Sequence, residues 1–123
     1  MKKILVADDE EILRMLIVDT LEDEGFDIDE AENGAEALAM LEKGNYDLTI
    51  LDYMMPEKTG IEVVKSLSDE VKKSTRLVML TAKAQAKDKQ EAIEAGADYF
   101  MAKPFSPSEL VVMIKQIFAE GLK

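Results

Sequence analysis

The sequence predicts an α/β fold: a (βα)5 three-layer sandwich with a parallel five-stranded sheet of the common order 2-1-3-4-5. First, short apolar runs alternate along the chain with segments whose apolar residues recur at helical spacing. Second, the runs are apolar almost throughout, which is typical of parallel strands buried on both faces. The 123 residues suit one domain, so we expect a single domain over residues 1–123, with no output domain after it.

The first strand and helix follow directly from this pattern. Residues 3–7 form an aliphatic run, and residues 26–31 form a short second strand. Gly25 ends the helix between them, because glycine tolerates the left-handed conformation of a C′ residue. The face of that helix is expected to comprise Ile12, Leu13, Leu16, Ile17, Thr20 and Leu21.

Turn signals bound the middle elements. Asn33-Gly34 precedes the second helix, Gly44-Asn45 stops it, and residues 46–51 form the third strand. The second helix is expected to pack through Ala37, Leu38 and Leu41.

A loop, a helix and a strand follow. Pro56 and Gly60 break the chain into the loop, and the third helix then fades into polar residues 69–75 before a fourth strand at 76–80. The third helix is expected to pack through Ile61, Val63, Val64 and Leu67.

The last elements differ in hydrophobicity. The fourth helix, residues 84–95, is the least apolar, and only Ile93 and a few alanines can attach it to the core. A fifth strand at 98–102 precedes the fifth helix, with Ser106 as its N-cap and Pro107 as its first residue. The fifth helix is expected to bury Leu110, Met113, Ile114, Ile117 and Phe118.

Composition excludes several classes of function. The net charge is −11 and no basic stripe is visible, so direct nucleic-acid binding is not expected. Without cysteine or histidine, the chain has no thiolate or imidazole metal site and no histidine-based catalysis. No apolar run approaches the 18 residues of a membrane span, so we expect a cytoplasmic protein that does not bind membranes.

Polar residues close four of the apolar runs. Asp8 and Asp9 follow the first strand, Asp52 the third, Thr81 the fourth and Lys103 the fifth. Carboxyl ends of parallel strands share one edge, where α/β proteins bind ligands, and the predicted order makes the first and third strands neighbours. Three carboxylates, a hydroxyl and an ammonium around one crevice can bind a divalent cation and accept a phosphoryl group.

These residues also carry a family resemblance that covers essentially the whole chain. The chain resembles the receiver domain of two-component response regulators, of the chemotaxis-receiver type, which has a flavodoxin-like fold. The motifs that carry the resemblance, in order, are Asp8-Asp9-Glu10, Asp52 with Met55-Pro56 and Gly60, Thr81-Ala82, and Lys103-Pro104-Phe105.

The resemblance implies a role for each acid. Asp52 is the phosphoacceptor, a carboxylate nucleophile that forms an acyl phosphate. Mg²⁺ is the implied cofactor, with Mn²⁺ able to substitute. Its ligands are Asp8, Asp9, Asp52 and the backbone carbonyl of Met54.

The resemblance further implies a switch. Thr81 and Lys103 contact the phosphoryl group, and Thr81 and Phe100 move together to alter the face formed by the fourth helix, fifth strand and fifth helix. The implied partners are a sensor histidine kinase or phosphotransfer domain, and an effector protein or second copy at that face. Such a protein assists its own phosphorylation and dephosphorylation and is not a turnover enzyme. The Lys103-Pro104 bond resembles the family's cis peptide.

Three other classes of protein fit the sequence less well. An aspartyl phosphatase of the haloacid dehalogenase type needs Asp-x-Asp, and Asp52-Tyr53-Met54 lacks the second acid. A flavin-binding domain would need a Ser/Thr/Gly-rich loop after the first strand, where this chain has acids that repel phosphate. A pseudo-receiver that only binds partners would not need the intact set of acids, threonine and lysine.

Overall fold

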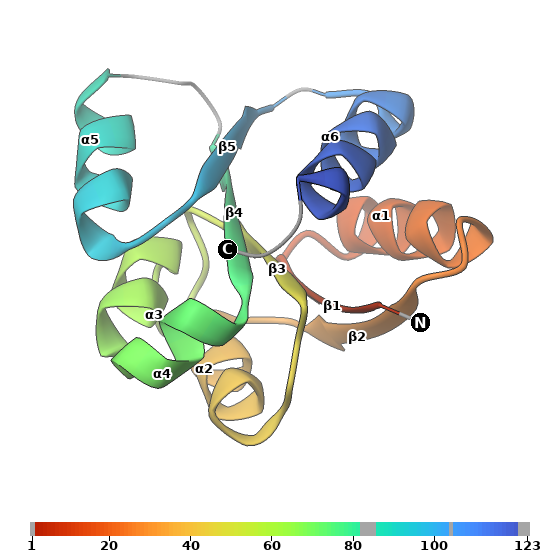
Figure 1. Ribbon diagram of the computed structural model, residues 1–123. Coiled ribbons are helices and arrows are strands. Elements are labelled where there is room, and N and C mark those ends of the chain that lie inside the picture. Colours follow the sequence, from red (N-terminus) through yellow and green to blue (C-terminus); the bar gives the residue numbers. More distant parts are fainter. Residues whose placement is uncertain (1, 82–85, 104, 121–123) are drawn as a thin grey trace.

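The computed structural model describes residues 2–81, 86–103 and 105–120, with only the backbone described for residues 86–89. A parallel sheet of order β2-β1-β3-β4-β5 lies between two layers of helices (Figure 1). Its strands are β1 (Lys3–Ala7), β2 (Asp27–Ala31), β3 (Leu48–Asp52), β4 (Arg76–Thr81) and β5 (Tyr99–Ala102). The predicted fold class and strand order are therefore confirmed.

Helices cover both faces of the sheet. They are α1 (Glu11–Asp23), α2 (Gly34–Lys43), α3 (Gly60–Ser66), α4 (Asp69–Ser74), α5 (Ala86–Ala95) and α6 (Pro107–Ala119). The pair α1 and α6 packs on one face, and α2, α3 and α5 pack on the other (Figure 1). Within the described residues, no helix is long and apolar enough to cross a membrane.

Helix α4 corrects the prediction of a polar extension of the third helix. Leu67 has extended backbone angles (φ −73°, ψ 145°), which end α3. Ser68 then acts as a new N-cap, with its hydroxyl accepting a hydrogen bond from the Val71 amide. The described chain therefore has six helices, and the predicted fourth and fifth helices are α5 and α6.

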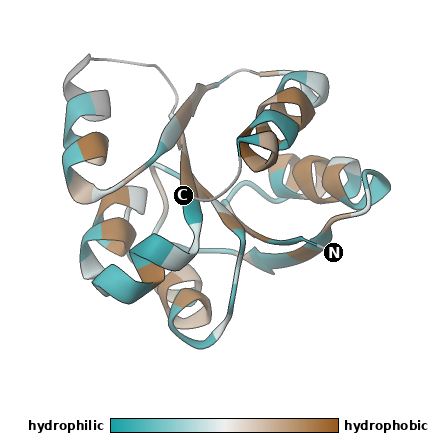
Figure 2. Ribbon diagram, in the orientation of Figure 1, coloured by the Kyte–Doolittle hydropathy of each residue, from teal (hydrophilic) through white to brown (hydrophobic). Residues whose placement is uncertain are grey.

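The core lies in two layers because successive strand residues point to opposite faces. Ile4 and Val6 of β1 face α1 and α6, whereas Leu5 and Ala7 face α2 and α3. Figure 2 shows the same arrangement, with hydrophobic strands at the centre and hydrophilic stretches on the outer sides of the helices. Both faces of the central strands are thus buried, as their continuous apolar sequence predicted.

Helix α1 buries a narrower stripe than expected. Ile17 and Leu21 are buried, but Ile12 is 85% exposed and Leu16 is 47% exposed. The stripe that faces the sheet runs from Arg14 through Ile17 to Leu21, at spacings of three and four residues. Ile12 and Leu16 therefore point away from the core, and Arg14, which was not part of the expected face, is buried.

Helix α5 also departs from expectation. Ile93 was expected to attach this helix to the core, but it is 52% exposed. Of the alanines that were expected to help attach it, Ala92 and Ala95, three residues apart on one face, are buried, so among the described side chains of α5 the alanine part of the expectation is confirmed. Two small side chains bury little apolar area, so the helix is weakly attached, as expected.

The predicted stop and start signals are confirmed. Gly25 (φ +91°) adopts the left-handed backbone conformation that glycine tolerates, as does Gly96 (φ +122°) after α5. Ser106 is the N-cap of α6, and its hydroxyl accepts a hydrogen bond from the Glu109 amide. Residues 84–85 of the predicted fourth helix, Ala82 and the Lys103-Pro104 peptide lie outside the described residues.

Candidate functional site

Strand register brings the polar residues to one edge of the sheet. Ala7 pairs with Leu51, so the next residues, Asp8 and Asp52, lie side by side at the ends of neighbouring strands. The main chain of β5 stays against β4 beyond the last pair, because the Lys103 amide donates a hydrogen bond of 2.6 Å to the Thr81 carbonyl oxygen. Asp8, Asp52 and Thr81, at the ends of β1, β3 and β4, therefore lie at the same edge of the sheet as Lys103.

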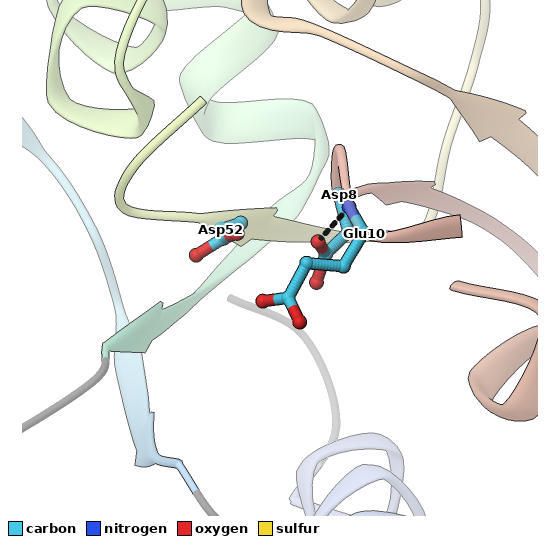
Figure 3. A group of neighbouring side chains, drawn as sticks. All are labelled: Asp8, Glu10 and Asp52. Atoms are coloured by element: carbon cyan, nitrogen blue, oxygen red, sulfur yellow. Dashed lines mark hydrogen bonds between the residues drawn. The ribbon is translucent and has the colours of Figure 1, made fainter. Parts of the chain in front are cut away.

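Three carboxylates form the centre of this edge. Asp8 is fully buried and Asp52 is 5% exposed. Each of Asp8, Glu10 and Asp52 offers an oxygen within 4.8 Å of the others (Figure 3). Lys103 Nζ lies 3.1 Å from Glu10 Oε1, 3.2 Å from Asp52 Oδ2 and 3.5 Å from Asp8 Oδ2. A single ammonium group therefore faces three acids.

The ionised form of Asp52 is destabilised by burial and by a neighbouring acid. Burial raises the pKa of the Asp52 carboxyl to about 7, and the nearby Asp8 carboxylate adds to this rise, whereas Lys103 opposes it. Burial alone would lower the pKa of the Lys103 ammonium, but the surrounding carboxylates outweigh it, and the net shift is upward. The site therefore carries more negative charge than its lysine neutralises.

Two buried polar atoms at this edge lack hydrogen bonds. Among the described residues, neither Thr81 Oγ1 nor Asp8 Oδ2 has a hydrogen-bond partner, although Lys103 Nζ lies near the latter. Buried polar atoms without partners are uncommon because each costs desolvation energy. Mg²⁺ prefers carboxylate oxygens as ligands, and these carboxylates carry more negative charge than Lys103 neutralises, so these residues fit a divalent cation.

The structure gathers a slightly different set of acids from the predicted ligands. Asp9 is exposed and lines a neighbouring cavity of about 440 Å³ together with Arg14, so it lies outside the three-carboxylate group. Glu10 is the third member of that group, although no role was predicted for it from the sequence. Its position as the third acid of the Asp8-Asp9-Glu10 run was the available signal. Asp9 and the carbonyl of Met54, whose side chain is 63% exposed, stay predictions as ligands.

Gly60 shapes the loop after β3. Its amide donates a 2.8 Å hydrogen bond to the Tyr53 carbonyl oxygen, which folds the loop back on itself. A Cβ at Gly60 would lie 2.6 Å from the Asp52 carbonyl oxygen. Any other residue would therefore push the Asp52 main chain out of place, which explains why the loop requires glycine here.

Phe100 lies next to the site but is not part of it. It pairs with Met79 across β4 and β5 and is partly buried against the core layer under α3 and α5. Its ring thus lies on the face of the sheet that α2, α3 and α5 cover. Its role in a switch stays a prediction.

Comparison with known protein families identifies the family of this chain. The sequence model of the response regulator receiver domain matches residues 4–115. The chain belongs to the response regulator receiver family. This receiver domain is 48% identical to the transcriptional regulatory protein ResD of Bacillus subtilis over 94% of the chain, and 43% identical to SrrA of Staphylococcus aureus over the same share.

Solved structures agree with this assignment. The chemotaxis response regulator CheY4 of Vibrio cholerae superposes with a TM-score of 0.89 at 36% identity, over 95% of this chain and 98% of that one. The response regulator TrrA of Thermotoga maritima gives 0.83 at 40% identity, over 94% and 98%. The receiver spans about half the length of its curated relatives, 47% of both ResD and SrrA, and the absence of an output domain stays a prediction.

Proposed function

We propose that this receiver accepts one phosphoryl group on Asp52 in two-component signal transduction in the cytoplasm. The donor is a phosphohistidine of a sensor histidine kinase or phosphotransfer domain, or a small phosphodonor. The observation that carries the proposal is the position of Asp52, which lies 3.2 Å from Lys103 Nζ. Its strand also lies between β1, which Asp8 follows, and β4, which ends at Thr81, whose hydroxyl has no hydrogen-bond partner among the described residues.

The reaction needs little covalent chemistry from the protein. An Asp52 carboxylate oxygen forms a bond to phosphorus while the bond from phosphorus to the donor nitrogen breaks. The electron pair returns to the imidazole, which takes up a proton. Catalysis then consists of alignment and charge neutralisation, which Lys103 and a bound cation contribute against the phosphoryl oxygens.

Mg²⁺ is the proposed cofactor, with Mn²⁺ as a substitute. Asp8, Asp9, Asp52 and the Met54 backbone carbonyl are its proposed ligands, and the bound ion supplies positive charge where the donor's phosphoryl oxygens approach. The charge excess at the acids supports this assignment, as does Asp8 Oδ2, which has no hydrogen-bond partner among the described residues. So does TrrA, which was solved in complex with Mg²⁺-BeF.

Signal output is proposed to follow from Thr81. Its buried hydroxyl donates a hydrogen bond to the phosphoryl group, and its movement leaves space that Phe100 fills. The α5-β5-α6 face then changes for an effector protein or a second copy of the chain, while nucleic acid and membrane are not direct partners. A shift from about 1% to 99% active needs about 5.5 kcal/mol of preference for the active state. Each chain takes up and loses its own phosphoryl group and is not a turnover enzyme.

The central claim is tested by intact-mass measurement after incubation with acetyl phosphate and Mg²⁺. We expect one added phosphoryl group in the wild type, none in Asp52→Asn, and none when a chelator removes the metal. Asp23→Asn, which alters an exposed aspartate on α1, is the matched control and should be phosphorylated normally. Equal modification of wild type and Asp52→Asn would reject Asp52 as the acceptor.

A further inference from the structure

Arg14 is a buried cation close to the site, and the proposed reaction gives it no part. Its guanidinium is on the core-facing stripe of α1, and the residue is 7% exposed. Nη1 donates a 2.7 Å hydrogen bond to the Asp8 carbonyl oxygen, and Nε donates one of 3.0 Å to Glu30 Oε1. Nη2 lies 3.6 Å from Glu32 Oε1. Burying a guanidinium is costly, and these contacts offset that cost.

We infer that Arg14 is a positioning residue for the divalent cation, because it fixes the peptide unit that joins the two adjacent acids Asp8 and Asp9. The Asp8 carbonyl and the Asp9 amide belong to one planar group, so the direction of that carbonyl sets where the chain places Asp9. This inference rests on the proposed Mg²⁺ site. In it, Arg14 touches no ligand atom and acts only through the main chain.

The rest of the turn is constrained in the same way. The Asp8 amide donates to the Ala31 carbonyl oxygen at 3.2 Å, and the Glu10 amide donates to Asp8 Oδ1 at 2.9 Å, the bond drawn in Figure 3. The peptide unit between them is held by Arg14, which Glu30 at the end of β2 orients in turn. The fork of the guanidinium joins helix, turn and strand, which a single ammonium group cannot do.

A merely structural arginine and a positioning arginine predict opposite changes in metal affinity. If only charge mattered, removing a cation near the acids would strengthen Mg²⁺ binding. If Arg14 positions the Asp8-Asp9 peptide, removing it weakens binding, by about tenfold or more, as for other groups that orient metal ligands. The sign of the change therefore decides between the two roles.

The test is a Mg²⁺ titration of the whole chain, followed by calorimetry and by amide chemical shifts. We expect Arg14→Met to raise the Kd for Mg²⁺ about tenfold. Arg14→Lys keeps the charge but not the fork, so its Kd should lie between those of Arg14→Met and wild type. Arg76→Lys is the matched control, because Arg76 is also buried (8% exposed) and donates to the Ile117 carbonyl oxygen from the other end of a strand. Its Kd should not change.

A second measurement separates positioning from damage to the acceptor. At saturating Mg²⁺, Arg14→Met should regain the wild-type rate of phosphorylation by acetyl phosphate. An unchanged or tighter Kd in Arg14→Met overturns the inference, and if that variant does not fold, an unchanged Kd in Arg14→Lys does so. If wild type binds Mg²⁺ but is not phosphorylated, the proposed function fails alone. If wild type binds no Mg²⁺, both fail.

Discussion

The two ends of the sheet treat buried polar groups in opposite ways. Where β3 and β4 begin, the Thr49 and Thr75 hydroxyls hydrogen-bond each other at 3.0 Å, and Arg76 donates to the Ile117 carbonyl oxygen. Where the strands end, Asp8 and Asp52 repel each other, and Thr81 Oγ1 has no partner among the described residues. One end meets the ordinary requirement for stability, and the other violates it.

This difference supports the proposed site without reference to any relative. Unpaired buried polar atoms and repelling acids lower stability, so a fold keeps them where a ligand needs them. The partners missing at the carboxyl ends of the strands are a cation for the acids and an acceptor for a hydroxyl. The proposed phosphoryl group and Mg²⁺ would supply both. The comparison predicts that substitutions at the two ends change stability with opposite sign.

The largest expected effect is at the satisfied end. Arg76→Met removes the hydrogen bond to the Ile117 carbonyl and leaves a buried acceptor unpaired, which should lower the free energy of unfolding by about 3 kcal/mol. Urea denaturation followed by circular dichroism measures it. Lys65→Met, at an exposed position of α3, is the control and should change stability by less than about 0.5 kcal/mol. Equal losses in the two variants would mean that the buried contact contributes nothing.

The next effect is a gain at the functional end. In chelator at about pH 8, Asp52→Asn should raise the free energy of unfolding by about 2 kcal/mol, because it relieves burial of a charge and repulsion from Asp8. Thermal and urea melts of both proteins measure it. A clear loss of stability would show that the contact between Asp52 and Lys103 outweighs the repulsion. Added Mg²⁺ should stabilise wild type and remove the advantage of the variant.

The same acid predicts a pH dependence. The pKa of Asp52 rises from its ordinary 3.8 to about 7 on folding, so between these values the folded protein keeps a proton that the unfolded chain has lost. Stability contributed by this group is complete below about pH 4, declines as pH rises, and is lost above about pH 7. The stability difference between wild type and Asp52→Asn in chelator should widen across this window and then level off. A difference independent of pH would contradict the raised pKa.

The smallest expected effect is the difference between two substitutions of the same kind, one at each end of the sheet. Thr49→Val removes a hydrogen bond between buried hydroxyls and should cost about 1 kcal/mol. Thr81→Val removes a hydroxyl that has no hydrogen-bond partner in the described part of the chain, and it should be neutral or stabilising by up to about 1 kcal/mol. Both positions are buried threonines on neighbouring strands, so the shape change is the same. Parallel urea melts compare them. Destabilisation of the same size in both would remove the contrast between the two ends.

Much of the fold could be predicted because its signals are local. Gly25 and Ser106 ended and began their helices as expected, since a C′ glycine and an N-cap serine act within one helical turn. The strand that ends at Asp52 could be predicted because a run that is apolar on both faces is typical of a parallel strand buried on both faces of the sheet. Helix α4 was missed because a serine N-cap within a polar stretch resembles an ordinary loop.

Periodicity and chain order predicted the alternation of strands and helices and put Asp8, Asp52, Thr81 and Lys103 at strand ends. Which neighbouring residues point inward depends on how the helices pack on the sheet. This packing buries Asp8 and exposes Asp9, and it brings Glu10 to Lys103. It also turns Arg14 toward the core in place of Ile12. The reason is that the rotation of α1 is set by packing against the sheet and α6, which involves residues about a hundred positions apart.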